Sequence, residues 1–209
     1  MGCLPIYGVS MTRRGYVKER IIRTLLNNPT GTLTKYRAAK EAGASYSWAH
    51  EFLANLERGG FVEGTKVTDY RGLMLHWLSL RRSPRKRDYM VQDPMRLFID
   101  ADMKYAVTSY QGETLVQGYL FPSRVDVYVR GEDQRRWLKL LSDNGLVGKG
   151  NVRTLVDDEH VFYNSHTVKN INVVSTPQLI LDLLIEGGPS AEAAEMLLEK
   201  VAPEHVRRE

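Results

Sequence analysis

The chain has 209 residues, of which 43% are hydrophobic, and a formal net charge of +4. No apolar run approaches the ~20 residues that span a bilayer, and the first ten residues lack the charged start of a signal peptide. The single cysteine, Cys3, excludes an intrachain disulfide and suits a reducing compartment. We therefore expect a cytoplasmic protein that has no membrane partner and is long enough for two domains of about 100 residues each.

Three helices are expected first along the chain, after an N-terminal extension over residues 1–15. The predicted ranges are residues 16–27, 34–42 and 45–58, each with apolar residues at helical spacing. Ser45 is a favoured N-cap residue for the third helix, because its hydroxyl can accept a bond from a first-turn N–H. Gly60 ends that helix, since glycine readily takes the positive φ of a C-terminal cap.

A β-hairpin is predicted after the third helix, with strands over residues 61–65 and 73–80 and a loop over residues 66–72. The loop carries Lys66 and Arg71. Taken together, residues 16–80 resemble a winged helix-turn-helix DNA-binding domain. The resemblance implies that the third helix enters the major groove and that the loop is the wing.

Charge is divided unevenly between the halves of the chain. Residues 1–98 hold 17 Lys and Arg against 8 Asp and Glu, a net charge of +9, and residues 99–209 hold 12 against 17, a net charge of −5. A basic half suits a polyanion, because each neutralised phosphate releases a counterion. The densest basic run spans residues 81–87 and lies in a predicted linker over residues 81–95. The run is either a solvated linker kept open by self-repulsion or an arm that follows the DNA backbone, and the two interpretations are compatible.

The second half of the chain, residues 96–209, mixes predicted strands with helices, which favours an α/β layer structure. The predicted strands are residues 104–109, 125–130, 151–156, 160–163 and 171–174. The predicted helices are residues 110–117, 132–144, 177–186 and 191–201, and residues 145–150 are a predicted loop.

Two short segments of this half are placed as in a nucleotidyltransferase. Thr108-Ser109 is followed by Asp126-Val127-Tyr128, where the resemblance expects Gly-Ser and then Asp-x-Asp on a strand. Two carboxylates are needed to hold metal ions against a triphosphate, and Tyr128 replaces the second one. We therefore expect a scaffold without catalytic residues or cofactor. The histidines and Cys3 show no ligand spacing, so no metal site is expected.

A winged helix followed by a nucleotidyltransferase-like domain resembles the AbiEi group of antitoxin-type transcriptional regulators. The segments that carry the resemblance are residues 105–109, 125–129, 137–141, 173–184 and 191–195. The resemblance implies a repressor of its own operon, the antitoxin of a type IV toxin–antitoxin pair. It also implies a cognate toxin of nucleotidyltransferase type as a partner.

Candidate DNA contacts lie on the second and third helices, on the wing and in the basic run. They are Lys35, Arg37, Ser45, Tyr46, Ser47, Trp48, His50, Lys66, Arg71, Arg81, Arg82, Arg85, Lys86 and Arg87. Trp48 either faces DNA or covers the core. One winged helix makes few base contacts, so we expect a homodimer or paired monomers on a double-stranded operator with repeated half-sites.

Two other functions remain open from the sequence. The chain could be a nucleotidyltransferase that its winged helix recruits to nucleic acid, although the missing second carboxylate disfavours this. It could also be a protein-interaction module, since winged helices serve as docking sites, although the basic first half disfavours that.

Overall fold

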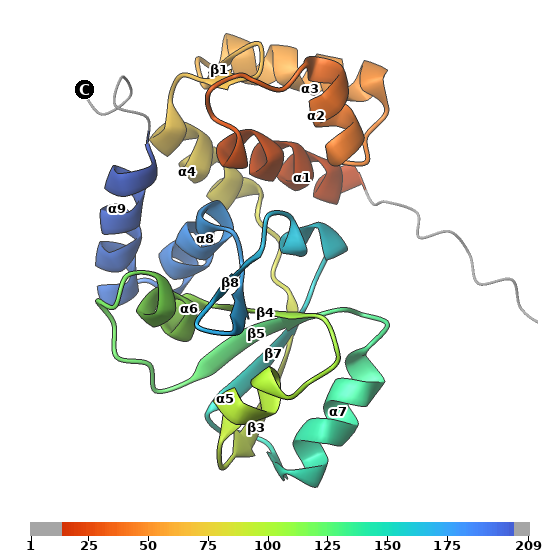
Figure 1. Ribbon diagram of the computed structural model, residues 1–209. Helices are drawn as coiled ribbons and strands as arrows, with labels where there is room; N and C mark the ends of the chain where they lie inside the picture. The colour runs from red at the N-terminus through yellow and green to blue at the C-terminus, as the bar shows by residue number, and fades with distance from the viewer. Residues whose placement is uncertain (1–13, 203–209) are drawn as a thin grey trace, which may run out of the picture.

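The computed structural model describes residues 14–202 of the chain. The predicted extension over residues 1–15 lies outside the described residues except for Arg14 and Gly15, which begin the first helix. Within residues 14–202 the fold is mixed α+β, as expected (Figure 1). None of the helices in this part of the chain has the length and apolar character needed to cross a membrane.

The first three predicted helices are confirmed. They are α1 (Arg14–Asn27), α2 (Lys35–Glu41) and α3 (Tyr46–Arg58). Thr34 caps α2, because its hydroxyl oxygen accepts a bond of 3.1 Å from the backbone N–H of Arg37. Gly43, at φ +63°, makes the turn into α3, and Gly60, at φ +77°, follows its C-terminal end.

The predicted hairpin is much smaller than expected. Strand β1 (Val62–Glu63) pairs with β2 (Lys66–Val67), and a short turn joins them. The loop predicted over residues 66–72 was wrong, because β2 and the start of the next helix occupy it. The strand predicted over residues 73–80 was wrong, because these residues belong to helix α4 (Tyr70–Leu80). Asp69 caps this helix by accepting a bond of 2.7 Å from the N–H of Gly72. Its buried residues have helical spacing, which decides against a strand; they are Tyr70, Leu73, Met74 and Trp77.

The linker predicted over residues 81–95 was also wrong. Its basic run leads into strand β3 (Arg85–Val91), which pairs antiparallel with β7 (Val152–Val156). Helix α5 (Pro94–Ile99) follows, capped by Asp93 and started by a proline at its first turn. The first half of β3 carries charge, but Tyr89 and Val91 at its end are buried, and these apolar residues fix the strand in the sheet.

A seven-stranded mixed sheet forms the centre of the second half, in the order β6-β3-β7-β5-β4-β9-β8. Its other strands are β4 (Tyr105–Thr108), β5 (Val125–Val129), β6 (Gly145–Val147), β8 (His166–Val168) and β9 (Ile171–Val173). Strand β5 lies antiparallel to β4 and parallel to β7. The strand predicted over residues 160–163 was wrong, because the 3₁₀ turn η1 (Glu159–Phe162) occupies it. The loop predicted over residues 145–150 begins with β6.

Helices cover both faces of the sheet (Figure 1). They are α6 (Ser109–Val116), α7 (Gln134–Asp143), α8 (Thr176–Glu186) and α9 (Pro189–Val201), as predicted within a few residues. Side chains alternate between the faces of a strand. Val125, Val127 and Val129 therefore pack with the apolar residues of α5 and α7. Asp126 and Tyr128 face the opposite layer, where Tyr128 packs in the same cluster as α8 and α9.

One apolar cluster joins the two halves of the chain. It contains the buried residues of α1, α3 and α4 together with those of α8 and α9, and both α1 and α4 contact α8 directly. Helices α1, α3 and α4 are therefore packed on the second half through a shared core, in contrast to a module on a flexible linker.

A buried ion-pair network crosses the same junction. The Arg81 guanidinium lies 3.2 Å from Glu19 Oε2 of α1 and 2.6 Å from Asp157 Oδ2 after β7. It also donates to the hydroxyl of Tyr128 on β5 at 3.1 Å. Its side chain is only 4% exposed, and those of Glu19 and Asp157 are 2% exposed. Burial alone would lower the pKa of Arg81, but Tyr128, Asp157, Asp182 and Glu19 together raise it.

A second group of polar contacts lies beside this network. Arg20 of α1 forms a two-point ion pair with Asp158, at 2.7 and 2.6 Å. His160 contacts Arg23 at 3.1 Å through Nδ1 and the carbonyl of Glu41 at 3.1 Å through Nε2. Burial, followed by the charges of Arg23 and Arg20, lowers the pKa of His160 to about 3. The imidazole is therefore neutral, accepting from Arg23 and donating to Glu41.

We expect Arg81→Met to reduce the free energy of unfolding by about 3–5 kcal/mol, because it leaves two buried carboxylates without their cation. Urea unfolding followed by circular dichroism measures this loss. Arg71→Met is the control, since Arg71 and its partner Glu195 are largely exposed, and such pairs contribute about 0–1 kcal/mol. Equal losses for the two variants would contradict a stabilising role for the network.

We expect stability to fall as the pH drops from 6.5 toward 3, because unfolded His160 binds a proton in this interval and folded His160 does not. His160→Gln removes this contribution and makes the pH dependence of the unfolding free energy shallower. The exposed His166 supplies the control His166→Gln, which keeps the original slope. An unchanged slope in His160→Gln would mean that His160 is not the titrating group.

Candidate functional site

Helix α3 presents its first turns to solvent and buries the opposite face. Tyr46, Ser47 and His50 are exposed, while Ala49 and Phe52 are buried in the core. Ser45 occupies the N-cap position, but its hydroxyl makes no capping bond, in contrast to the prediction. These exposed groups lie together at the N-terminal end of a helix that is held firmly from behind.

Aromatic rings connect α2 and α3 on this surface. The ring of Tyr46 lies 6.3 Å from that of Tyr36 and 5.9 Å from that of His50, measured between centroids. Trp48 behaves differently, since it is half-buried and stacks on Phe52 at 5.5 Å. Of its two open interpretations, the structure favours the one in which Trp48 covers the core. Tyr36 was not predicted as part of this surface, although it lies at the start of the capped second helix beside the predicted contacts Lys35 and Arg37.

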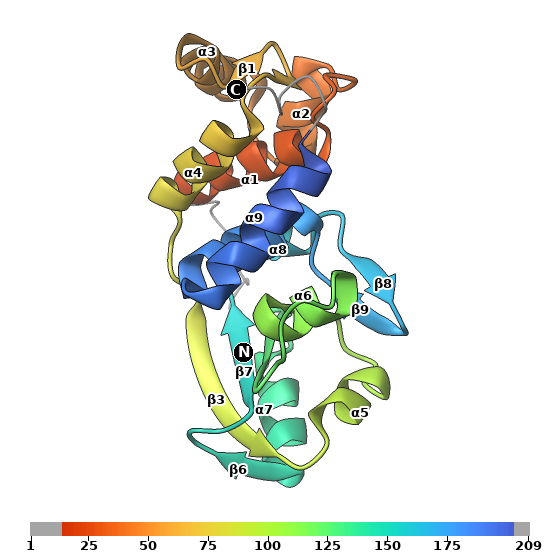
Figure 2. The same ribbon diagram turned by 90° about the vertical axis from the view of Figure 1, so that its left-hand side faces the viewer.

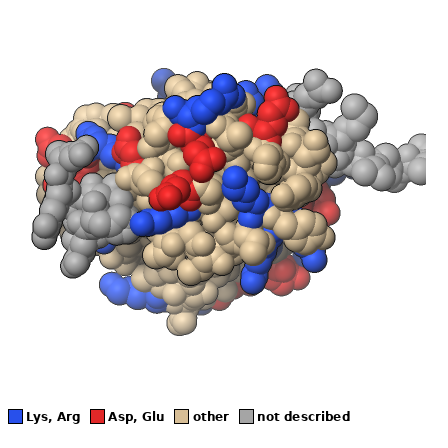
Figure 3. Space-filling view, turned by 90° about the horizontal axis from the view of Figure 1, so that it is seen from above, with Lys and Arg blue, Asp and Glu red and all other residues tan. Residues whose placement is uncertain are grey.

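The charges on this end of the molecule are mixed. Lys35 lies 3.9 Å from Glu57, and Arg37 lies 2.9 Å from Glu41. Lys66 is exposed, and its backbone bridges to Thr30 just before α2. Figure 3, which looks onto this end, shows basic and acidic side chains interspersed. The surface offers hydrogen-bonding groups and isolated cations, but its basic groups do not form one continuous field.

Several predicted DNA contacts lie away from α3. Arg71 belongs to α4 and pairs with Glu195 of α9, so it is not part of a wing. Arg81 is buried in the junction, where it cannot reach a phosphate. The guanidinium of Arg82 lies 5.6 Å from the ring of Tyr16. The sequence treats residues 81–87 as one basic segment, whereas tertiary contacts separate Arg81 and Arg82 from the rest of the run.

Arg85, Lys86 and Arg87 are exposed on β3, in the sheet. Figures 1 and 2 place α1 and α4 between α3 and this strand. The predicted contacts therefore divide into two groups on different parts of the surface. The group around α3 contains Lys35, Arg37, Ser45, Tyr46, Ser47, His50 and Lys66.

The segments that resemble a nucleotidyltransferase do meet in space. Thr108 is directly opposite Asp126 across the β4–β5 pair. Asp126 is 1% exposed, and Arg124 donates to both of its carboxylate oxygens, at 2.9 and 3.1 Å. Burial raises the pKa of Asp126 in spite of the opposing effect of Arg124. The cavity beside these residues measures only about 30 Å³.

Asp182 of α8 completes this cluster and was missed by the sequence analysis. It accepts bonds from Thr108 at 2.7 Å, from Tyr128 at 3.0 Å and from Gln178 at 2.9 Å. Burial raises the pKa of Asp182 to about 6, although Arg81 and these three donors oppose the shift. The available signal was a single acid within the otherwise apolar residues 179–184. Among the described residues, no group of three or more His, Cys, Asp or Glu is arranged to hold a metal ion.

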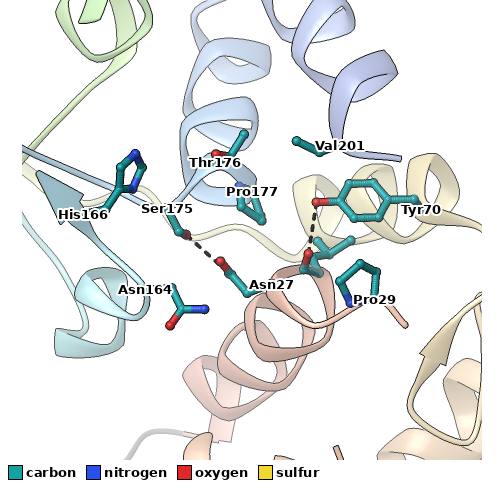
Figure 4. Close-up of a pocket in the computed structure, with 10 residues that line it drawn as sticks. Asn27, Pro29, Tyr70, Asn164, His166, Ser175, Thr176, Pro177 and Val201 are labelled. Carbon is teal, nitrogen blue, oxygen red and sulfur yellow. Dashed lines mark hydrogen bonds between the residues drawn. The ribbon is translucent and has the colours of Figure 1, made fainter. Parts of the chain in front are cut away.

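A hollow of about 450 Å³ opens where the two halves of the chain meet (Figure 4). Asn27 from α1 and Ser175 before α8 lie at its centre, joined by a hydrogen bond of 3.4 Å. Tyr70 of α4 closes one side and donates to the carbonyl of Leu26 at 3.2 Å. All the residues that line the hollow in the described chain are uncharged or histidine, so it carries no built site for a charged ligand.

Comparison of the sequence with protein-family models and with curated proteins, and of the structure with solved structures, found no match in any of the three.

Proposed function

We propose that this protein is a DNA-binding transcriptional regulator that uses α3 as its recognition helix. The observation that carries the proposal is the exposed N-terminal face of α3, with Tyr46, Ser47 and His50 directed away from a buried opposite face. Recognition helices contact base edges with the residues of their first turns. Hydroxyl and imidazole groups bond to bases or phosphates, and a tyrosine hydroxyl commonly bonds to phosphate.

Phosphate contacts near α3 are few in this arrangement. Lys35 and Arg37 already have acidic partners, so a duplex must compete with those partners for the two cations. Lys66 and Lys40 are exposed, and their side chains form no ion pair within residues 14–202. A single module would therefore bind duplex DNA weakly, which favours a homodimer or paired copies on an operator with repeated half-sites.

We further propose that the protein is an autorepressing antitoxin of the AbiEi type whose second half is a non-catalytic nucleotidyltransferase-like domain. The pairing of β4 with β5 and of β5 with β7 supports this, since Thr108 and Asp126 meet where the resemblance expects them. Arg124 neutralises Asp126, and Tyr128 takes the place of a second carboxylate. A cavity of about 30 Å³ is small beside the roughly 300–1,000 Å³ of ligand pockets. A nucleotidyltransferase-type toxin is the proposed partner, and the cytoplasm is the proposed location.

The test is a titration of the full-length protein onto DNA from upstream of its own gene and onto scrambled DNA of equal length, at two salt concentrations. We expect a preference for the upstream DNA that persists at the higher salt. The double variant Ser47→Ala/His50→Ala should reduce this preference at least about fivefold, because each lost hydrogen bond is worth about 0.5–1.5 kcal/mol. Fluorescence anisotropy measures both affinities.

Asn55→Ala is the matched control, since Asn55 is exposed on the same helix but lies two and a half turns beyond Tyr46. It should leave the preference unchanged. Equal binding to both DNAs by the unmodified protein would contradict sequence-specific recognition and leave only non-specific binding through basic side chains. Absence of binding at both salt concentrations would contradict the proposal and favour a protein partner.

A further inference from the structure

We propose that the groove beside the first half of β3 binds the phosphates of a nucleic-acid backbone, at a site separate from α3. The proposal rests on the proposed function in taking nucleic acid as the partner. It goes beyond that function by assigning a second contact surface, which lies on the sheet.

The first observation is that the cations of this groove are unpaired. Within residues 14–202, the side chains of Arg85, Lys86 and Arg87 form no hydrogen bond, ion pair or ring contact. Most other arginines of the described chain have such a partner; on the neighbouring α7, for example, Arg136 pairs with Asp102 and Asp133. Lys86 interacts with the charge of Asp88, but none of the three cations is held by a hydrogen bond or an ion pair in the described chain, so they can bind an external anion.

The second observation is that the edge of β3 is open at these residues. Strand β6 pairs with Tyr89, Met90 and Val91, and the N–H of Gly148 bonds to the carbonyl of Asp88. Arg85, Lys86 and Arg87 are therefore paired on one side alone, with β7. Arg85 and Arg87 lie about 6.6 Å apart on one face of the strand, given the rise of ~3.3 Å per residue. Such a row matches a ligand with regularly spaced charges along a chain.

The third observation is the shape and lining of the groove. It measures about 380 Å³ and is lined by Arg85, Lys86 and Arg87 together with Gln134, Thr154 and Val156. In this described part of the chain its lining contains three cations, two neutral hydrogen-bonding side chains and no acid. Because no aromatic ring lines the groove, it offers no base-stacking platform, and recognition falls on the phosphates.

The position of the groove separates it from the recognition helix. In Figure 2, α1, α4 and the α8–α9 layer lie between α3 and the start of β3. A straight duplex lying across α3 would not also enter the groove. The groove therefore binds either a more distant segment of the same, bent DNA or a separate strand, and in both cases the recognised chemistry is the phosphodiester backbone.

The experiment compares full-length protein with the triple variant Arg85→Ala/Lys86→Ala/Arg87→Ala by anisotropy over a range of salt concentrations. The probes are a short duplex, a long duplex and single-stranded oligothymidylate. We expect the variant to lower the slope of log affinity against log salt by about 2–3 on at least one probe, since each phosphate contact contributes about 0.9 on a duplex and 0.7 on a single strand. A change on the long duplex alone indicates bent DNA, and a change on oligothymidylate indicates a separate strand; both support the proposal.

The control Arg96→Ala/Arg136→Ala/Lys139→Ala removes the same net charge from exposed cations that already have acidic partners. This control should have the same slope as the unmodified protein. Arg85→Lys/Arg87→Lys keeps both charges and should have most of that slope, which would show that the alanine variant acts through lost charge and not through misfolding. Equal slopes for the β3 variant and the unmodified protein on every probe would overturn the inference. If Ser47→Ala/His50→Ala still reduced the sequence preference in that case, the proposed function would stand while this inference failed.

Discussion

The architecture depends on one buried cation at the junction of its two halves. Arg81 lies directly after α4 and is surrounded by Glu19 of α1, Asp157 after β7 and Tyr128 on β5. Charges removed from water are costly unless they are paired and hydrogen-bonded. The network therefore penalises any arrangement that separates the helices from the sheet, and the apolar cluster shared by α1, α4 and α8 acts in the same direction. The two together fix the direction in which α3 faces.

If the second half is the proposed nucleotidyltransferase-like domain, the same network occupies the region where such an enzyme would hold its metal ions. Tyr128 connects Arg81 to Asp182, and Asp182 in turn binds Thr108, so the cluster is closed by internal bonds. Asp126 is held separately by Arg124. The nucleotidyltransferase resemblance implies that these residues face a triphosphate. In this structure they face each other, and the cavity beside them measures only about 30 Å³. Opening this cluster to form a catalytic site would break the buried bonds that stabilise the junction.

The basic character of the first half of the chain is distributed very unevenly in space. Three of its arginines lie at the junction and bind buried acids and polar groups there; they are Arg20, Arg23 and Arg81. Lys35 and Arg37 have acidic neighbours on α3 and α2. Three successive cations without an ion pair, Arg85, Lys86 and Arg87, lie instead on β3, in the sheet. Net charge by halves thus favours a polyanionic partner, but it does not indicate which surface would meet that partner.

The sequence by itself determined the elements whose apolar spacing and caps are local. Helices α1, α2 and α3 and strands β4, β5 and β7 follow from periodicity and from residues such as Thr34 and Gly60. It also placed Thr108 and Asp126 on two predicted strands, whereas their pairing across β4 and β5 comes from the structure. The helix over residues 73–80 also has local signals, the helical spacing of its apolar residues and the cap Asp69, which the predicted hairpin overlooked. Tertiary structure alone decided that the basic run leads into a strand, because burial of Tyr89 against distant partners outweighs local charge and propensity. It alone also decided that Arg81 is buried in an ion-pair network. The acids that pair with Arg81 are distant in sequence, up to 76 residues away at Asp157, so no local pattern contains them.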